Sequence, residues 1–284
     1  MLTPPGDARL AASLDLLKRQ GLPPGEFEVL VAAHGPAIGL SRAVALSRAV
    51  SEAHAPRIWV MDVADRLPVN AASILLKRMN QEDLDLLAFS LRLAAPLRAE
   101  RLRFDLSARL PQSPIMDGAS MLSRHDFQPE LACVVAAAHL WKAGALALPE
   151  GHDPVIDRAA MPQLVLRARR ASYLRRRIVT RRRDTAGPSP DDAVATARSL
   201  RELVERLKAE GNPSANLALR LLRRAELVAI DCLRGLLLSG VPLAKRALVH
   251  ERLRAAGALP IRHLGRPEAT LRVRFWAWVV RVLG

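Results

Sequence analysis

The chain has 284 residues, half of them apolar, so it is long enough for one large or two modest domains with a hydrophobic core. Its formal net charge is +15, and arginine supplies most of the cations, which indicates an anionic partner. Two cysteines are too few for a disulfide framework, and no run approaches the roughly 20 apolar residues of a membrane-spanning helix. The first residues also lack the pattern of a signal peptide. Composition therefore predicts a globular cytoplasmic protein.

Helical and strand patterns alternate over the first third of the chain. Apolar spacing predicts helices over residues 8–20, 40–53 and 70–80, and strands over residues 26–33, 58–61 and 85–93. Alternation of this kind is typical of parallel α/β units, in which a helix connects each strand to the next. We therefore expect an α/β domain with a mostly parallel sheet flanked by helices.

Two carboxylates follow the strand predicted over residues 58–61. Asp62 and Asp65 come at its carboxyl end, the position where ligands bind in open α/β sheets. Acids there are candidates for holding a metal ion or a sugar hydroxyl. The alternative is that Asp65 begins a turn and that Asp62 pairs with a neighbouring arginine. The stretch by itself favours neither interpretation.

The last third of the chain is predicted to be helical. Residues 184–190 are rich in Gly, Pro and Ser and form the best candidate for a linker. Ser189 then offers a capping hydroxyl, with Pro190 and two acids in the first turn of the helix that follows. Two more helices are expected over residues 217–238 and 242–256. The predicted domains are residues 1–183 and a helical extension over residues 189–284.

Nine arginines and no acid lie between Arg167 and Arg183. A solvated cationic face is the ordinary interpretation of such a run. The sharper interpretation is a patch that binds anionic lipid head groups, since clustered basic side chains are attracted to a charged membrane surface. Nucleic acid is disfavoured as the partner, because a single tyrosine and few other aromatics offer little to stack against bases.

The chain contains an ordered series of short motifs: Leu2-Thr-Pro-Pro-Gly-Asp7, Glu28-Val-Leu-Val, Gly39-Leu-Ser, Trp59-Val-Met-Asp62-Val-Ala-Asp65-Arg-Leu67, Asp85-Leu-Leu-Ala-Phe89, Leu148-Pro-Glu-Gly151 with Asp157, and Arg167-Ala-Arg-Arg-Ala-Ser-Tyr-Leu174. In order and spacing this series resembles the family 2 glycosyltransferases of the GT-A fold, which extend bacterial capsule, lipopolysaccharide or wall polysaccharides from nucleotide-sugars. Together the motifs cover roughly residues 1–210. The resemblance implies a GT-A-like fold. We expect the protein to be cytoplasmic, or to lie peripherally at the inner face of the cell membrane.

The same resemblance implies a reaction and the residues that perform it. The donor would be a nucleotide-sugar, and the acceptor a glycan or a lipid-linked sugar. Asp62, Asp7 and Gly39 would bind substrate, and Asp62 with Asp65 would hold a divalent cation, Mn or Mg, on the diphosphate. Asp157 would be the catalytic base that takes the proton from the acceptor hydroxyl. Its alternative role is that of an acid at a helix start.

Several positions depart from the family pattern. His34 stands where the family has the acid that recognises the nucleotide base, and Ala64 replaces the second Asp of the metal motif. The arginine that usually follows Gly-x-Ser is displaced to Arg42, and Ile156 replaces the glutamate of a Glu-Asp pair. Two functions therefore remain open, an active transferase and a degenerate relative that binds a partner in polysaccharide assembly. A basic nucleic-acid-binding protein is the third and weakest hypothesis.

Overall fold

The computed structural model describes residues 1–23, 25–94, 112–125, 130–144, 146–151, 154–182, 187–211, 215–262, 275–276 and 278–279. The chain divides into two compact units. The first consists of residues 1–146 and 160–183, and the second of residues 147–159 and 184–284. The division near residue 183 lies beside the predicted linker, while residues 147–159 group with the helical part of the chain.

The first unit is built on a central sheet. Its strands are β1 (Leu2–Thr3), β2 (Ala32–Ala33), β3 (Arg57–Trp59), β4 (Asp65–Arg66), β5 (Leu86–Ala94), β6 (Val134–Ala137) and β7 (Ala171–Arg182). Five of them form one sheet in the order β3-β6-β5-β7-β4, while β1 pairs with β2 in parallel. Hydrogen bonds of Leu2 with Met61 and Val63 connect β1 to the segment after β3.

The α/β class is confirmed, and the sheet is mixed where the sequence predicted a mostly parallel one. β5 and β7 are parallel, whereas β6 is antiparallel to both of its neighbours and β4 is antiparallel to β7. None of the motifs predicted β6, which lies between β3 and β5 and runs in the opposite direction to both. Alternation of helix and strand in the first 94 residues carried no information about that strand.

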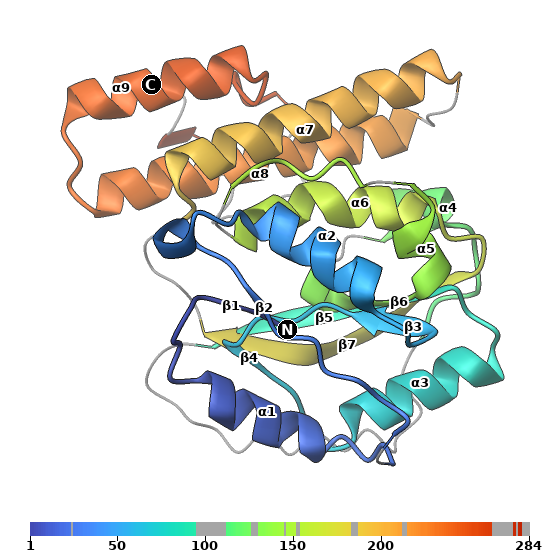
Figure 1. The fold of residues 1–284 in the computed structure, drawn as a ribbon. Helices are drawn as coiled ribbons and strands as arrows, with labels where there is room; N and C mark the ends of the chain where they lie inside the picture. The colour runs from blue at the N-terminus through green and yellow to red at the C-terminus, as the bar shows by residue number, and fades with distance from the viewer. Residues whose placement is uncertain are drawn as a thin grey trace. The chain divides into compact units, whose positions relative to one another are not determined.

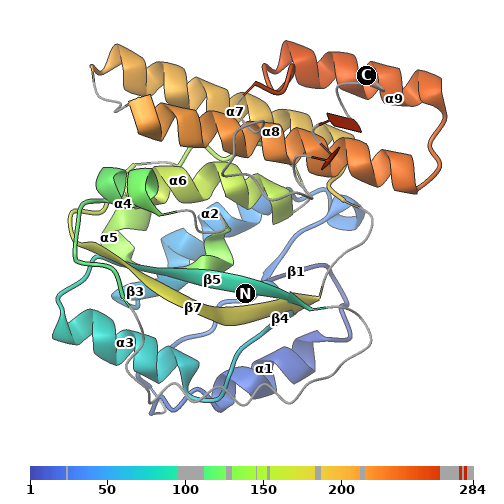
Figure 2. The same ribbon diagram turned by 180° about the vertical axis from the view of Figure 1, so that it is seen from behind.

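Short helices cover the two faces of the sheet. They are α1 (Leu10–Lys18), η1 (Pro36–Ile38), α2 (Arg42–Glu52), α3 (Ala71–Gln81), α4 (Gly118–Arg124), η2 (Leu131–Cys133) and α5 (Ala138–Lys142). In both ribbon views α1 and α3 lie on one face, and α2 and α5 on the other (Figures 1 and 2). The three helices predicted in the first 80 residues are all confirmed to within about two residues at each end.

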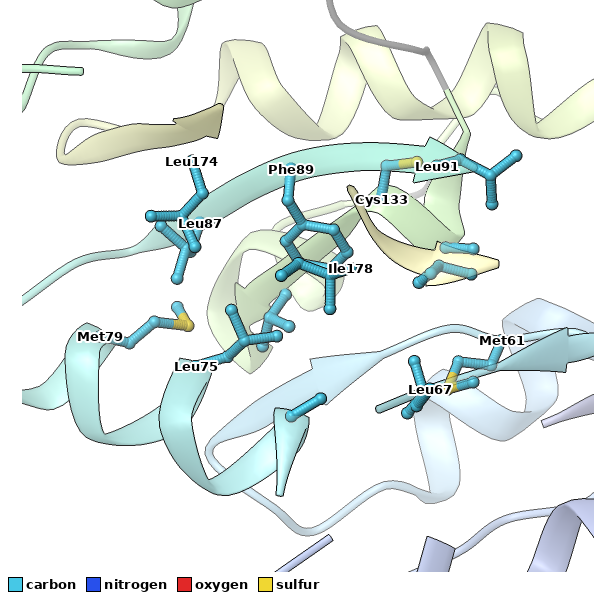
Figure 3. Close-up of a cluster of buried hydrophobic side chains, with 14 of the residues drawn as sticks. Met61, Leu67, Leu75, Met79, Leu87, Phe89, Leu91, Cys133, Leu174 and Ile178 are labelled. Atoms are coloured by element: carbon cyan, nitrogen blue, oxygen red, sulfur yellow. The ribbon is translucent and has the colours of Figure 1, made fainter. Parts of the chain in front are cut away.

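A buried apolar cluster of the first unit lies between the sheet and α3. Figure 3 shows Leu75 and Met79 of α3 facing Leu87 and Phe89 of β5. All four side chains are at most 1% exposed. Phe89 also packs edge to face against Trp59 of β3, with ring centroids 5.5 Å apart. Burial of these side chains removes apolar surface from water and is the principal force that joins helix to sheet.

The strand predicted over residues 26–33 is shorter than expected. Only Ala32 and Ala33 pair as a strand, with Leu2 and Thr3. Residues 27–30 instead line an apolar cavity of about 230 Å³, together with residues of α2 and β3. A strand needs a hydrogen-bonded neighbour along its length, and β1 supplies one for only two residues. The strand prediction therefore holds only for the last two residues of the run, and Val29 and Val31 are 37% and 45% exposed.

The arginine-rich run between residues 167 and 183 forms much of β7. This strand lies inside the sheet, where it pairs with β5 on one side and β4 on the other. Arg175 and Arg177 are exposed, whereas Ile178 and Val179 are buried. Within β7, exposed arginines and buried apolar residues thus belong to the same strand. A membrane contact through the exposed arginines stays a prediction.

The second unit is largely helical. It contains η3 (Pro154–Ile156), α7 (Pro190–Ala209), α8 (Ala215–Leu238) and α9 (Leu243–Ala255), while α6 (Asp157–Leu166) begins in it and continues into the first unit. The three helices predicted after residue 189 are confirmed, and α7 and α8 lie side by side (Figures 1 and 2). Ser189 caps α7 as expected, since its hydroxyl accepts from the Asp192 amide at 3.2 Å.

The Pro-Glu-Gly turn of the motif series packs on the start of α7. A Cβ atom added to Gly151 would lie 1.9 Å from Oδ1 of Asp192, so any larger residue would require the Asp192 side chain to move. The turn is thereby held within the second unit. Among the residues that the structure describes, no helix is both long enough and apolar enough to cross a membrane.

Candidate functional site

Asp62 and Asp65 lie together just beyond the end of β3. The Asp65 amide donates to the Asp62 carbonyl at 3.0 Å, which closes a tight turn. The Asp62 amide in turn donates to Oδ2 of Asp65 at 2.8 Å. Asp65 then begins β4, which pairs with the end of β7. The turn therefore aims both carboxylates toward β7.

Arg42, in the first turn of α2, forms an ion pair with Asp62. Its Nη1 and Nη2 atoms donate to Oδ1 and Oδ2 of Asp62 at 2.8 and 3.1 Å, the parallel two-bond arrangement that favours arginine over lysine. Arg42 is only 1% exposed, and its Nη1 also lies 3.3 Å from Nε2 of His34. His34 is thus packed against a buried guanidinium at the position where the family pattern has an acid.

Arg181, near the end of β7, contacts three carboxylates at once. Its Nε and Nη2 atoms donate to the two oxygens of Asp65 at 2.6 and 2.9 Å. Nη2 also lies 3.0 Å from Oδ2 of Asp62, and Nη1 donates to Oε2 of Glu130 at 2.7 Å. Every nitrogen of the guanidinium group is therefore engaged. We call Arg42, Asp62, Asp65, Glu130 and Arg181 the carboxylate–arginine cluster.

Burial and charge act against each other in this cluster. Burial favours the neutral form of Asp62, but the attraction of Arg42 and Arg181 outweighs it, so the pKa of Asp62 lies below its ordinary value. For Asp65 burial is the larger influence and raises the pKa, although Arg181 opposes it. Both acids depend on the arginines for their charged form, because little water reaches them.

The cluster does not fit the divalent cation that the resemblance implies. Each of the four carboxylate oxygens of Asp62 and Asp65 already accepts from a guanidinium group, and Oδ2 of Asp65 also accepts from a backbone amide. A cation such as Mg²⁺ needs free oxygen lone pairs about 2.1 Å from one point. Within the described part of the chain, no three His, Cys, Asp or Glu side chains are arranged to hold a metal ion.

The other two predicted substrate-binding residues lie in turns of the first unit. Asp7 is partly exposed and binds Arg9, whose Nε lies 2.9 Å from Oδ1. The side-chain and backbone hydrogen bonds from Arg9 lower the pKa of Asp7 to about 2. Gly39 ends η1 with a left-handed φ of 62°, a conformation that favours glycine. The backbone turn at Gly39 leads directly into the capped start of α2 and hence to Arg42.

The predicted catalytic base begins a helix in the second unit. Asp157 is the first residue of α6 and is 3% exposed. A carboxylate in the first turn of a helix is stabilised in its ionised form by the helix dipole. This placement agrees both with a general base and with the structural alternative. Asp153 is the only nearby acid in sequence that could serve as base in its place, and it lies outside the described residues.

Sequence reasoning missed two members of the cluster. Arg181 was read only as one of nine arginines in a cationic run, and Glu130 carried no signal at all. Glu130 lies 51 positions from Arg181 in the sequence, so no local pattern could connect them. The apolar cavity beside residues 27–30 does not include any of these side chains. The side chains of the carboxylate–arginine cluster therefore do not line that cavity.

Comparison with known proteins identifies the fold. No protein-family model and no curated protein matches the chain. The structure of residues 1–349 of S. aureus TarS in complex with UDP is 14% identical and has a TM-score of 0.66, covering 100% of this chain and 86% of that one. The same fragment in complex with UDP-GlcNAc gives a TM-score of 0.53 at 14% identity, covering 99% and 90%.

A longer S. aureus TarS structure matches with a TM-score of 0.50 at 14% identity, covering 90% of this chain and 52% of that chain. This chain thus spans about half the length of that protein. At such low identity the likeness shows the fold alone. The α/β fold is GT-A-like, as the motif series implied.

Proposed function

We propose that this chain is a glycosyltransferase that takes a sugar from a nucleotide-sugar donor and passes it to a surface-polysaccharide or glycolipid acceptor. The observation that supports this most directly is the fold, which matches TarS bound to UDP over the whole chain. The motif series adds that Asp62 follows β3, at a strand end of the kind where ligands bind in open α/β folds. Asp62, Asp7 and Gly39 are the proposed substrate-binding residues.

The proposed chemistry is direct displacement at the anomeric carbon. Asp157 takes the proton of the acceptor hydroxyl, the oxygen forms a bond to the anomeric carbon, and the bond to the nucleoside diphosphate breaks. The diphosphate leaves with the bonding electron pair. The start of α6 supports this role, because a helix dipole favours the ionised form of a carboxylate in the first turn.

A second candidate is a degenerate relative that binds a partner in polysaccharide assembly without transferring sugar. The carboxylate–arginine cluster favours it, since Asp62 and Asp65 already have guanidinium partners. His34 favours it as well, because it replaces the acid that the family uses to recognise the nucleotide base. The two candidates differ in whether the first unit binds nucleotide.

Calorimetric titration of the full chain with UDP, UDP-GlcNAc and other nucleoside diphosphates separates the candidates. Each titration is run once with manganese and once with EDTA. Saturable binding of at least one nucleotide, weakened by Asp62→Asn, is the result expected of the transferase. Silence across the panel in both buffers would refute the proposal and leave the partner-binding candidate.

Replacing Asp157 by Asn is expected to lower sugar transfer by about 100-fold or more, the scale usual for loss of a general base. Asn keeps the size of the side chain and removes its basicity, so donor binding in the titration above should barely change. Asp191→Asn is the matched control, because Asp191 is also an acid in the first turn of a helix. Full transfer activity in Asp157→Asn would refute the assignment and direct attention to Asp153.

A further inference from the structure

The carboxylate–arginine cluster has the composition of a metal site in which organic cations have taken the metal's place. Three carboxylates converge from two separate stretches of the chain, Asp62 and Asp65 after β3 and Glu130 before η2. Such a set of hard oxygen donors is what Mg²⁺ and Mn²⁺ prefer. The group they surround is the guanidinium of Arg181, at nitrogen–oxygen distances of 2.6 to 3.0 Å.

The charge balance of the cluster supports the same conclusion. Arg181 and Arg42 together carry two positive charges, the charge of one divalent ion, against the three carboxylates. Both arginines are nearly buried, Arg42 at 1% and Arg181 at 13% side-chain exposure. Because little water screens them, they would repel an incoming cation strongly. A metal could bind here only after the arginines had moved away from the carboxylates.

The shape of the cluster excludes a metal as well. A planar guanidinium spreads its partners around its edge, so the carboxylates point at three different nitrogens. A metal ion instead draws its ligand oxygens toward one point. The strand β7 fixes Arg181 in this position, because its last residues pair with both β4 and β5.

We propose that the guanidinium of Arg181, supported by Arg42, takes the place of a divalent cation among Asp62, Asp65 and Glu130. Ligand binding at this end of the sheet is then independent of divalent metal. The guanidinium would take this place whether or not the chain transfers sugar. A failed transferase assay therefore leaves the proposal intact.

Titration of the full chain with Mn²⁺ tests the proposal, with free Mn²⁺ followed by electron paramagnetic resonance. The wild-type protein is expected to show no Mn²⁺ binding at this site up to about 1 mM, the weak end of biological hard-cation sites. Asp65→Asn serves as the site marker. Binding to the wild type that disappears in Asp65→Asn would overturn the proposal.

Removing the guanidinium gives the complementary test. Arg181→Ala leaves three carboxylates without their shared cation and is expected to bind Mn²⁺ at least about 10-fold more tightly than the wild type. Arg175→Ala is the matched control, since it removes an exposed arginine from the same strand. A folded Arg181→Ala protein that gains no more Mn²⁺ binding than Arg175→Ala would contradict the proposal.

Thermal unfolding keeps this test decisive if Arg181→Ala folds poorly. Mn²⁺ is expected to raise the melting temperature of Arg181→Ala and to leave that of the wild type unchanged, because a ligand stabilises only a protein that binds it. Where the variant is unfolded in EDTA, recovery of its native circular dichroism in Mn²⁺ supports the proposal. The wild-type titration with the Asp65→Asn marker decides the question if that recovery fails.

Discussion

Replacing Arg42 by Met is expected to lower the free energy of unfolding by about 3–5 kcal/mol at neutral pH, the cost of removing one partner from a buried ion pair. Met fills much of the volume but cannot donate to Asp62, whose carboxylate loses two hydrogen bonds. Urea unfolding of the variant and the wild type measures the difference. Arg48→Met, an exposed arginine on the same helix, should change stability by less than about 0.5 kcal/mol.

The loss caused by Arg42→Met should depend on pH. In the wild type the folded-state pKa of Asp62 lies below its unfolded value, so this group contributes stability above a pH of about 4. That contribution disappears as the pH falls through the folded-state pKa. The difference between wild type and variant should therefore be larger at about pH 7 than at about pH 3.5. A difference that is equal at both values would show that Arg42 acts through packing and not through charge.

Replacing Phe89 by Ala is expected to lower the free energy of unfolding by about 3–5 kcal/mol, as for other large-to-small changes in a packed core. Phe89 is 0% exposed and sits at the centre of the cluster in Figure 3. Its loss also removes the edge-to-face contact with Trp59. Chemical denaturation followed by near-ultraviolet circular dichroism, to which Trp59 contributes, measures the difference.

Val69→Ala is the control for the core substitution, since Val69 belongs to the same unit and is 58% exposed. It should change the free energy of unfolding by less than about 0.5 kcal/mol. Comparable losses in Phe89→Ala and Val69→Ala would mean that the cavity left by the ring collapses at little cost. That result would contradict the expectation that Phe89 contributes strongly to the stability of the core.

The sequence was most informative where the pattern is local. The helices α2 and α3 were predicted because their apolar residues recur at helical spacing, and α7 because its capping residues are adjacent in sequence. The order of these elements was enough to obtain the α/β class. Antiparallel β6 could not be anticipated, because strand direction depends on how a distant segment returns to the sheet.

The candidate site was predicted only in part, for the same reason. Local pattern placed Asp62 and Asp65 at a strand end and offered an arginine partner for Asp62 as one alternative. The structure shows that alternative, with Arg42 as the partner. The local sequence pattern could not select Arg181 from the nine arginines of one run, because that choice depends on the register of β7 against β4.

Pairing of β4 with β7 also determines when the cluster can assemble during synthesis. Asp65 and Arg181 lie 116 residues apart, so at about 5–20 residues per second the ribosome makes Asp65 on the order of 10 s before its partner. Until then β5 lacks its parallel neighbour and Asp65 lacks its countercharge. Contacts of such long range also slow folding. The nascent first unit must therefore stay soluble with an open sheet edge until β7 emerges and fills the gap.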